Sequence, residues 1–282
     1  MRTYTLLLCL GLWRLTGLAA GQELDAPRPI DGIDTVWLEE MTWMEVRDAI
    51  QGGKTTIVVG TGGVEQNGPY VAAGKHNFVL QATAEAIARE LGDALVAPIV
   101  KFVPEGSIDP PSGHMNYHAT ISLREETFEA LLTDIVESLA QHGFTDIVLI
   151  GDSGGNQRGM EAVAEALNTR WGGAPSRVHF ISEYYTEDIY SCHLLESELG
   201  IYQQPPECVA TRGRYHDDYH YESIIATTDP VRIRAEQRMK AGLFSINGVE
   251  MSPLETTIAN GRRLVRYRAE ITARAVRRAR GR

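Results

Sequence analysis

Two short apolar runs in this chain each end in a loop of glycines and polar residues, and this pattern constrains the fold most strongly. Residues 55–59 (Thr-Thr-Ile-Val-Val) lead into a glycine-rich loop that contains Glu65. Residues 147–150 (Ile-Val-Leu-Ile) lead in the same way into Gly-Asp-Ser-Gly-Gly-Asn. Open α/β sheets carry their sites at such carboxyl ends of buried strands. Two such junctions in one sheet would bring Glu65, His76 and Asp152 into one pocket.

Helical and strand patterns alternate around these junctions. Apolar runs at 94–100 and 177–182 predict further strands. This alternation predicts an α/β protein, a single-domain three-layer sandwich with a mostly parallel sheet. A chain of 282 residues requires no second domain. The helices are predicted at 42–51, 78–91, 122–141 and 158–171, the third opened by a capping box of Ser122 and Glu125.

The first residues are typical of a secretory signal peptide. Residues 1–21 combine a basic residue, an apolar run from Leu6 to Leu12 and small residues before a linker at 22–34. We therefore expect a secreted or periplasmic protein with no stable membrane span. Cys192 and Cys208, the two cysteines outside this segment, either form a disulfide or stay free.

Charge narrows the range of partners. The net charge of −10 argues against nucleic acid as a partner, because nucleic-acid binders carry a basic footprint. The segment 251–282 is the exception, with nine Arg against one Glu from Gly261 onward. We expect it to form a basic helix that packs on the domain or on a neighbouring subunit; binding to a membrane surface or a polyanion is the alternative.

The two junctions resemble the creatininase family (creatinine amidohydrolases and relatives), whose strand ends typically read Glu-Gln-His-Gly, Gly-Thr-Asp and Gly-His-Gly-Gly-Asn. The resemblance covers residues 35–230 and implies a creatininase-like α/β domain over 35–250. It also implies hydrolysis of a C–N bond in a small cyclic or linear amide, with Glu, His and Asp ligands that hold divalent metals. Glu65 is retained here. Asn67, His76 and Ser153 stand where the family has His, Asp and His.

The resemblance implies a metal site built from Glu65, His76 and Asp152, with zinc or manganese as the ion. Carboxylates and neutral imidazole suit such hydrolytic metals. Asn67 is a poor zinc ligand, which favours one ion over two. From the residues alone, Glu65 can instead cap a helix or pair with a lysine, and His76 can be an ordinary loop histidine.

A later polar and aromatic run, residues 216–223, supplies further candidates. His216 matches a histidine that lines the family's site, and Asp218 and His220 are nearby alternates. The same run can instead be a solvated loop that precedes a short strand at 224–225. We expect His216 or Asp218 to complete the metal shell or to move protons.

The loops complete the expected site. The backbone amides of Gly154 and Gly155 would face an oxyanion. The long loop at 104–118 would cover the pocket through His114 and Glu105. The expected substrate-binding residues are Asn67, Ser153, Asn156, His114 and His220.

Two other functions remain open. Gly151 to Gly155 satisfy Gly-x-Ser-x-Gly between a strand and a helix, so Ser153 is a candidate nucleophile if a base such as His216 reaches it. The chain is alternatively a non-catalytic or metal-free protein that binds a small molecule on the same fold. The family tends toward hexamers, so the resemblance also implies a homo-oligomer.

Overall fold

A computed structural model describes residues 23–186, 193–204 and 217–281. The predicted signal peptide, Cys192, Cys208 and His216 lie outside these ranges. The chain divides after Gly32 into two units, and all the helices and strands below belong to the second, Ile33–Arg282.

The centre of this unit is a sheet of four parallel strands in the order β2–β1–β3–β4. Its strands are β1 (Thr56–Thr61), β2 (Ala94–Val96), β3 (Asp146–Gly151) and β4 (Arg177–Phe180). β1 and β3 pair along their whole length, from Thr56 opposite Asp146 to Thr61 opposite Gly151. Because the two strands end level, the two glycine-rich loops begin side by side. This register places both predicted junctions at one edge of the sheet.

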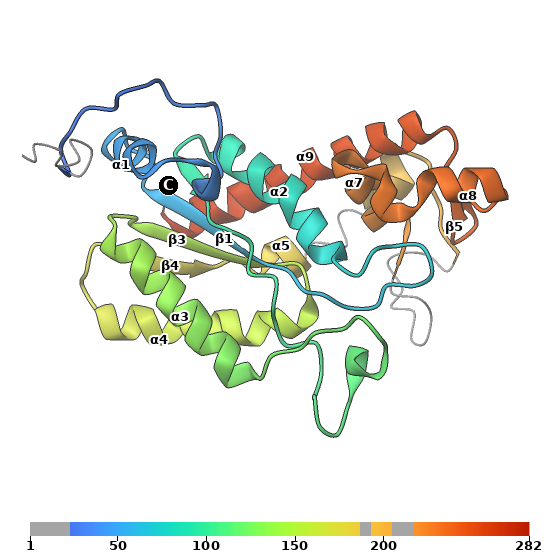
Figure 1. Cartoon of the computed structure of the whole chain (residues 1–282), viewed down its shortest axis with the longest axis horizontal. Coiled ribbons are helices and arrows are strands. Elements are labelled where there is room, and N and C mark those ends of the chain that lie inside the picture. Colours follow the sequence, from blue (N-terminus) through green and yellow to red (C-terminus); the bar gives the residue numbers. More distant parts are fainter. Residues whose placement is uncertain (1–22, 187–192, 205–216, 282) are drawn as a thin grey trace, which may run out of the picture. The chain divides into compact units, whose positions relative to one another are not determined.

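Helices cover both faces of the sheet (Figure 1). Ile57 and Val59 of β1 join one core cluster with α3 (Glu125–Gln141) and α4 (Gln157–Trp171). Val58, between them, faces the opposite cluster with α2 (Lys75–Leu91) and α9 (Leu254–Ala279). Side chains of a strand alternate between faces, so one β-branched run builds both cores. The predicted three-layer α/β sandwich with a parallel sheet is confirmed.

A third apolar cluster lies around the helices that follow residue 217. α9 passes along both α2 and α7 and contributes Leu264 here and Val276 to the sheet core. Its basic surface is tied to acidic residues elsewhere in the unit, for example by the pair of Arg277 and Glu90. The remaining elements are η1 (Leu38–Glu40), α1 (Trp43–Gln51), η2 (Gly113–Asn116), η3 (Gly154–Asn156), α5 (Glu183–Thr186), η4 (Leu194–Glu198), α7 (Tyr219–Thr228), η5 (Pro230–Ile233), α8 (Ala235–Ala241), β5 (Ser245–Ile246) and β6 (Val249–Glu250).

Three local predictions were wrong. α2 begins at Lys75 rather than at 78, so His76 lies in the first turn of a helix and not in a loop. α3 begins without a side-chain cap, because the Ser122 hydroxyl bonds to Glu105 and Gly106 of the long loop instead. Residues 224–225 belong to the buried helix α7 and not to a strand, and residues 217–223, the described part of the run that precedes them, are no solvated loop.

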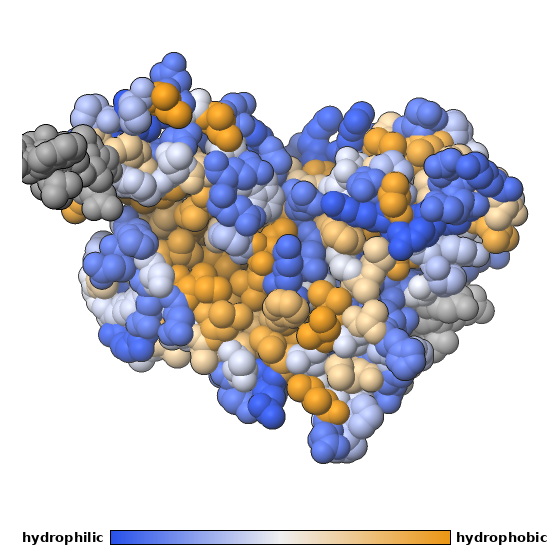
Figure 2. Space-filling model, in the orientation of Figure 1, coloured by the Kyte–Doolittle hydropathy of each residue, from blue (hydrophilic) through white to orange (hydrophobic). Residues whose placement is uncertain are grey.

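The surface carries an apolar region. Figure 2 shows apolar side chains gathered on the face in view, between the places that α1 and α3 take in Figure 1. Large apolar side chains of the unit are exposed, among them Trp43 of α1 and Leu131 of α3. Across the described ranges, no helix has the length and apolar character to cross a membrane.

Candidate functional site

Glu65, His76 and Asp152 form one chain of contacts at the carboxyl ends of β1 and β3. His76 Nε2 lies 2.7 Å from Oε1 of Glu65, and His76 Nδ1 lies 2.7 Å from Oδ2 of Asp152. All three side chains are about as buried as side chains can be, with 1% of each exposed. Glu65 follows β1, His76 sits in the first turn of α2 and Asp152 follows β3. The three side chains therefore lie together, as the positions of the two junctions predicted.

Asp152 is held by two residues that sequence reasoning missed. Tyr184 of α5 donates its hydroxyl to Oδ1 of Asp152 at 2.9 Å, and Nη1 of Arg268 from α9 lies 3.0 Å from the same oxygen. Burial acts to raise the pKa of Asp152, but the hydrogen bond from His76 and the charge of Arg268 outweigh it, so the pKa lies below its usual value. Asp152 is therefore an ionised carboxylate that fixes the His76 ring.

Lys75, the neighbour of His76, places a cation beside Glu65. Its Nζ lies 3.5 Å from Oε1 of Glu65, and none of its side chain is exposed. The ammonium also lies 4.5 Å from the ring centroid of Tyr221 in α7, and the Tyr221 ring stands perpendicular to the His76 ring with the centroids 5.9 Å apart. Aromatic faces attract cations, so Tyr221 supports the buried charge. Glu65 thus pairs with a lysine, which is one of the alternatives that its sequence position allowed.

The long loop contributes Glu105 and His114. Glu105 is buried, and its Oε2 accepts a hydrogen bond from Oγ of Ser153 at 3.5 Å. Burial and the negative charge of Glu65 raise the pKa of Glu105 to about 9. Its carboxyl group is therefore protonated at neutral pH. His114, 30% exposed, brings Nε2 to within 3.1 Å of Oε2 of Glu65, so it does reach the site.

The amide and glycine positions serve mainly to hold the loops. Asn156 donates to the carbonyls of Thr61 and Gly62 at 2.9 Å and so ties the end of β1 to the loop after β3. Asn67 donates to the carbonyl of Glu65. A Cβ on Gly155 would lie 2.2 Å from the Pro104 carbonyl oxygen, which explains the glycine there. Through these contacts the NH₂ groups of Asn67 and Asn156, two of the predicted substrate-binding residues, hold the loops in place.

Asp218 and His220, the candidates from the run at 216–223 that the structure describes, have different surroundings at α7. Asp218 is the N-cap of α7 and accepts a hydrogen bond from the amide of Tyr221. His220 is buried in α7, and its ring lies 5.0 Å from that of Tyr221. Asp217 is buried too, and its pKa is raised by that burial and by the charge of Glu222. This buried acidic patch adjoins Lys75, whose charge acts on Asp217 in the opposite direction.

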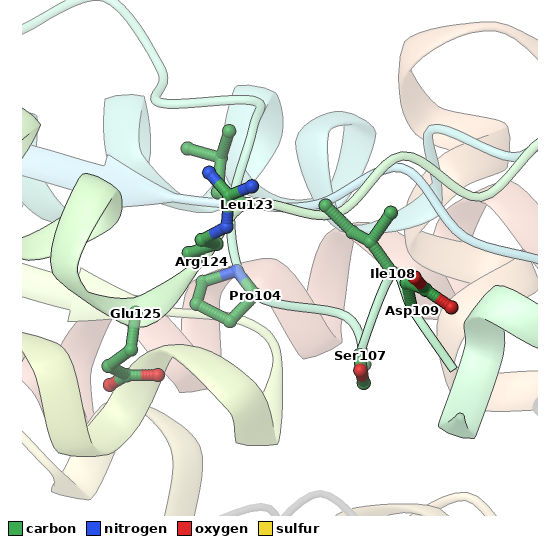
Figure 3. A pocket seen from close by; sticks show the side chains of 8 residues that line it. Pro104, Ser107, Ile108, Asp109, Leu123, Arg124 and Glu125 are labelled. Carbon is green, nitrogen blue, oxygen red and sulfur yellow. The ribbon is translucent and has the colours of Figure 1, made fainter. Parts of the chain in front are cut away.

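A pocket of about 480 Å³ lies beside the long loop and the start of α3. Figure 3 shows Arg124 and Asp109 on opposite sides of this pocket, with Pro104 between them. Its lining includes none of Glu65, His76 and Asp152. The contacts that join Glu65, His76 and Asp152 contain the groups that can transfer protons. We therefore take these residues as the candidate site and the pocket as a separate, neighbouring cavity.

The residues at the site fit a divalent metal poorly. A zinc ligand must direct a lone pair at the ion, yet both ring nitrogens of His76 already face carboxylate oxygens. The Lys75 ammonium lies next to Glu65, and its positive charge would repel a metal ion at the same carboxylate. Among the residues that the structure describes, no group of three or more His, Cys, Asp and Glu side chains could hold a metal ion.

Comparisons with known proteins agree on one family. A family model named Creatininase, creatinine amidohydrolase, matches residues 39–276. The creatinine amidohydrolase of Pseudomonas putida is 27% identical over 116 residues, which span 41% of this chain and only 44% of that relative. Among solved structures, a creatininase mutant of the Zn-Zn type has a TM-score of 0.64 at 18% identity, covering 87% of this chain and 98% of that one. A manganese creatininase gives a TM-score of 0.61 at 18% identity, covering 86% and 98%.

The structural likeness supports the fold, and the family match spans well over half of the chain. The glycine junctions, the parallel sheet and the position of Glu65 all follow the pattern that the sequence resemblance implied. On this evidence the chain belongs to the creatininase family, a family of metal-dependent amidohydrolases.

Proposed function

We propose that this protein hydrolyses a C–N bond in a small cyclic or linear amide. The observation that carries the proposal is the chain Glu65–His76–Asp152 with Glu105 and Ser153 beside it. It joins an ionised carboxylate network to a protonated carboxyl group in one buried site. Acid–base hydrolysis needs such a pair of groups in opposite protonation states.

The series of contacts from Asp152 through His76 to Glu65 suggests a role for each residue. Asp152, fixed by Arg268 and Tyr184, orients the His76 ring, which in turn positions Oε1 of Glu65. Glu65 is then the group that accepts a proton from an attacking water. Glu105, which carries a proton at neutral pH, is the group that donates one to the departing nitrogen.

The oxyanion side of the reaction falls to the loop after β3. The backbone at Gly154 and Gly155 is exposed in the short helix η3, where amide groups can face a developing negative charge. Zinc or manganese, which the family resemblance suggests, takes part in none of these steps, because the donor set does not fit a metal. Ser153 is a weak candidate nucleophile, since the acceptor of its hydroxyl proton is the protonated Glu105 and not a free base.

The burial of the site favours small substrates. Glu65 and His76 are almost fully covered, whereas His114 is partly exposed at the mouth of the long loop. A substrate would therefore enter past His114, with the loop at 104–118 moving aside.

A substrate panel tests the proposal. Purified protein is incubated with lactams, cyclic ureas, creatinine and linear primary amides, and the carboxylate and amine products are detected by NMR. We expect turnover of at least one class and its loss in Glu65→Gln. The control is Glu125→Gln, which alters the neighbouring pocket and should leave turnover unchanged. Equal rates in wild type and Glu65→Gln would refute the role of the site.

A second function, binding of a small molecule without catalysis, is favoured by the pairing of Lys75 with Glu65. This pairing occupies the carboxylate that would otherwise activate water. The same panel decides between the two, because a pure binding protein would show a rise in Tm with one compound and no product.

Location and assembly belong to the proposal as well. We propose a secreted or periplasmic protein that self-associates through the apolar face of Figure 2. Expression of the full chain with N-terminal sequencing of the exported product, followed by light scattering, tests both points. An uncleaved chain that stays monomeric would contradict them.

A further inference from the structure

The buried ammonium of Lys75 is the feature that amide hydrolysis leaves unexplained. A lysine that loses all contact with water is costly unless carboxylates surround it. Lys75 has 0% of its side chain exposed and lies 3.5 Å from Glu65. Its charge also acts on Glu105 and Asp217, which come from two other segments of the chain. One cation thus serves several acidic groups from different parts of the fold.

The imidazole of His76 is a second partner of the same carboxylate. Its Nε2 lies 2.7 Å from Oε1 of Glu65, and its Nδ1 lies 2.7 Å from Oδ2 of Asp152. Lys75 and His76, which are adjacent in the first turn of α2, therefore both approach Oε1 of Glu65, the lysine with its ammonium and the histidine with a ring nitrogen.

The polar side chains of the neighbouring loops have partners of their own. Asn67 directs its NH₂ group to the Glu65 carbonyl, and Ser153 directs its hydroxyl to Glu105.

We propose that the buried Lys75 ammonium, with the His76 ring beside it, takes the place of a divalent metal at Glu65, so that this chain holds its site together without a bound metal. The replacement accounts both for the buried lysine and for the His76 ring between two carboxylates. It makes no assumption about turnover, so it stands or falls separately from the proposed hydrolysis.

Metal analysis of the full chain is the first test. The protein is expressed in medium supplemented with zinc and manganese and purified without chelator, and its metal content is measured by plasma mass spectrometry. We expect substoichiometric metal in wild type and a Tm that neither EDTA nor added zinc shifts. Stoichiometric zinc or manganese in wild type that is lost in Glu65→Gln would overturn the proposal.

Substitution of the lysine is the second test. Lys75→Met keeps the length of the side chain and removes the charge, so we expect a lower Tm than wild type and a Tm that zinc raises. Lys75→Arg, which restores a cation, should recover most of the loss and abolish the effect of zinc. Lys101→Met, at an exposed position, is the matched control. A Lys75→Met protein with the Tm and zinc response of the Lys101→Met control would overturn the proposal, and should it fail to fold, the metal content of wild type still decides.

Discussion

Replacing Glu105 by Gln should change how the stability of the protein depends on pH. The pKa of Glu105 is raised from 4.5 to about 9, so between these values the folded protein holds a proton that the unfolded chain has lost. This contribution to stability is complete below pH 4.5 and declines as the pH rises toward 9. The slope for one proton is about 1.4 kcal/mol per pH unit. From pH 6 to pH 8 the wild type should therefore lose up to about 3 kcal/mol that Glu105→Gln, with no titrating group, does not lose.

Thermal unfolding of both proteins at several pH values measures this difference. One kcal/mol corresponds to about 2–4 °C in a domain of this size, so the Tm of Glu105→Gln should gain about 5–10 °C relative to wild type between pH 6 and pH 8. Glu125→Gln, at a carboxyl group outside the buried cluster, controls for general charge effects. Tm profiles of wild type and Glu105→Gln that stay parallel across this range would refute the assignment of a buried, protonated Glu105.

Two further substitutions test how the site is held. Arg268→Met leaves Asp152 as a buried carboxylate without its cation and should cost about 3–5 kcal/mol, or about 10 °C in Tm, whereas Arg274→Met at an exposed position of the same helix should change little. A Tm loss of equal size in both would contradict the role of Arg268. Gly155→Ala forces a Cβ against the Pro104 carbonyl and should cost about 1–3 kcal/mol in urea unfolding, while Gly173→Ala, which meets no atom within 4 Å, should be neutral. Wild-type stability in Gly155→Ala would show that the loop does not pack as described.

The sequence was sufficient to predict the sheet and the meeting of Glu65 with Asp152. Both predictions depend on local signals, namely β-branched runs that end in glycine, and parallel pairing of β1 with β3 then brings the two loops together. The start of α2 was harder to locate. Its first turn is polar and its N-cap is Gly74, which offers no capping side chain, so the apolar spacing becomes visible only from Phe78.

Other features lack any local signal. Arg268 lies 116 residues from Asp152, and nothing in a basic helix marks which of its arginines is buried against this carboxylate. α7 is buried on nearly all sides, so it has no polar face to reveal a helical period, and the apolar pair at 224–225 looked like a strand. The role of the Lys75 charge likewise depends on the fold, which places this side chain in the interior next to Glu65.

Glu65 and its hydrogen-bonded partners are proposed to form a hydrolytic site that works without a metal. The most direct test is kcat/KM for the amide that the panel identifies, measured on wild type and Glu65→Gln after exhaustive removal of metal by chelation. We predict that stripped wild type keeps its full rate and that Glu65→Gln loses about 10²-fold or more, the usual contribution of one acid–base group. A wild-type rate that disappears on chelation and returns with zinc or manganese would contradict the claim.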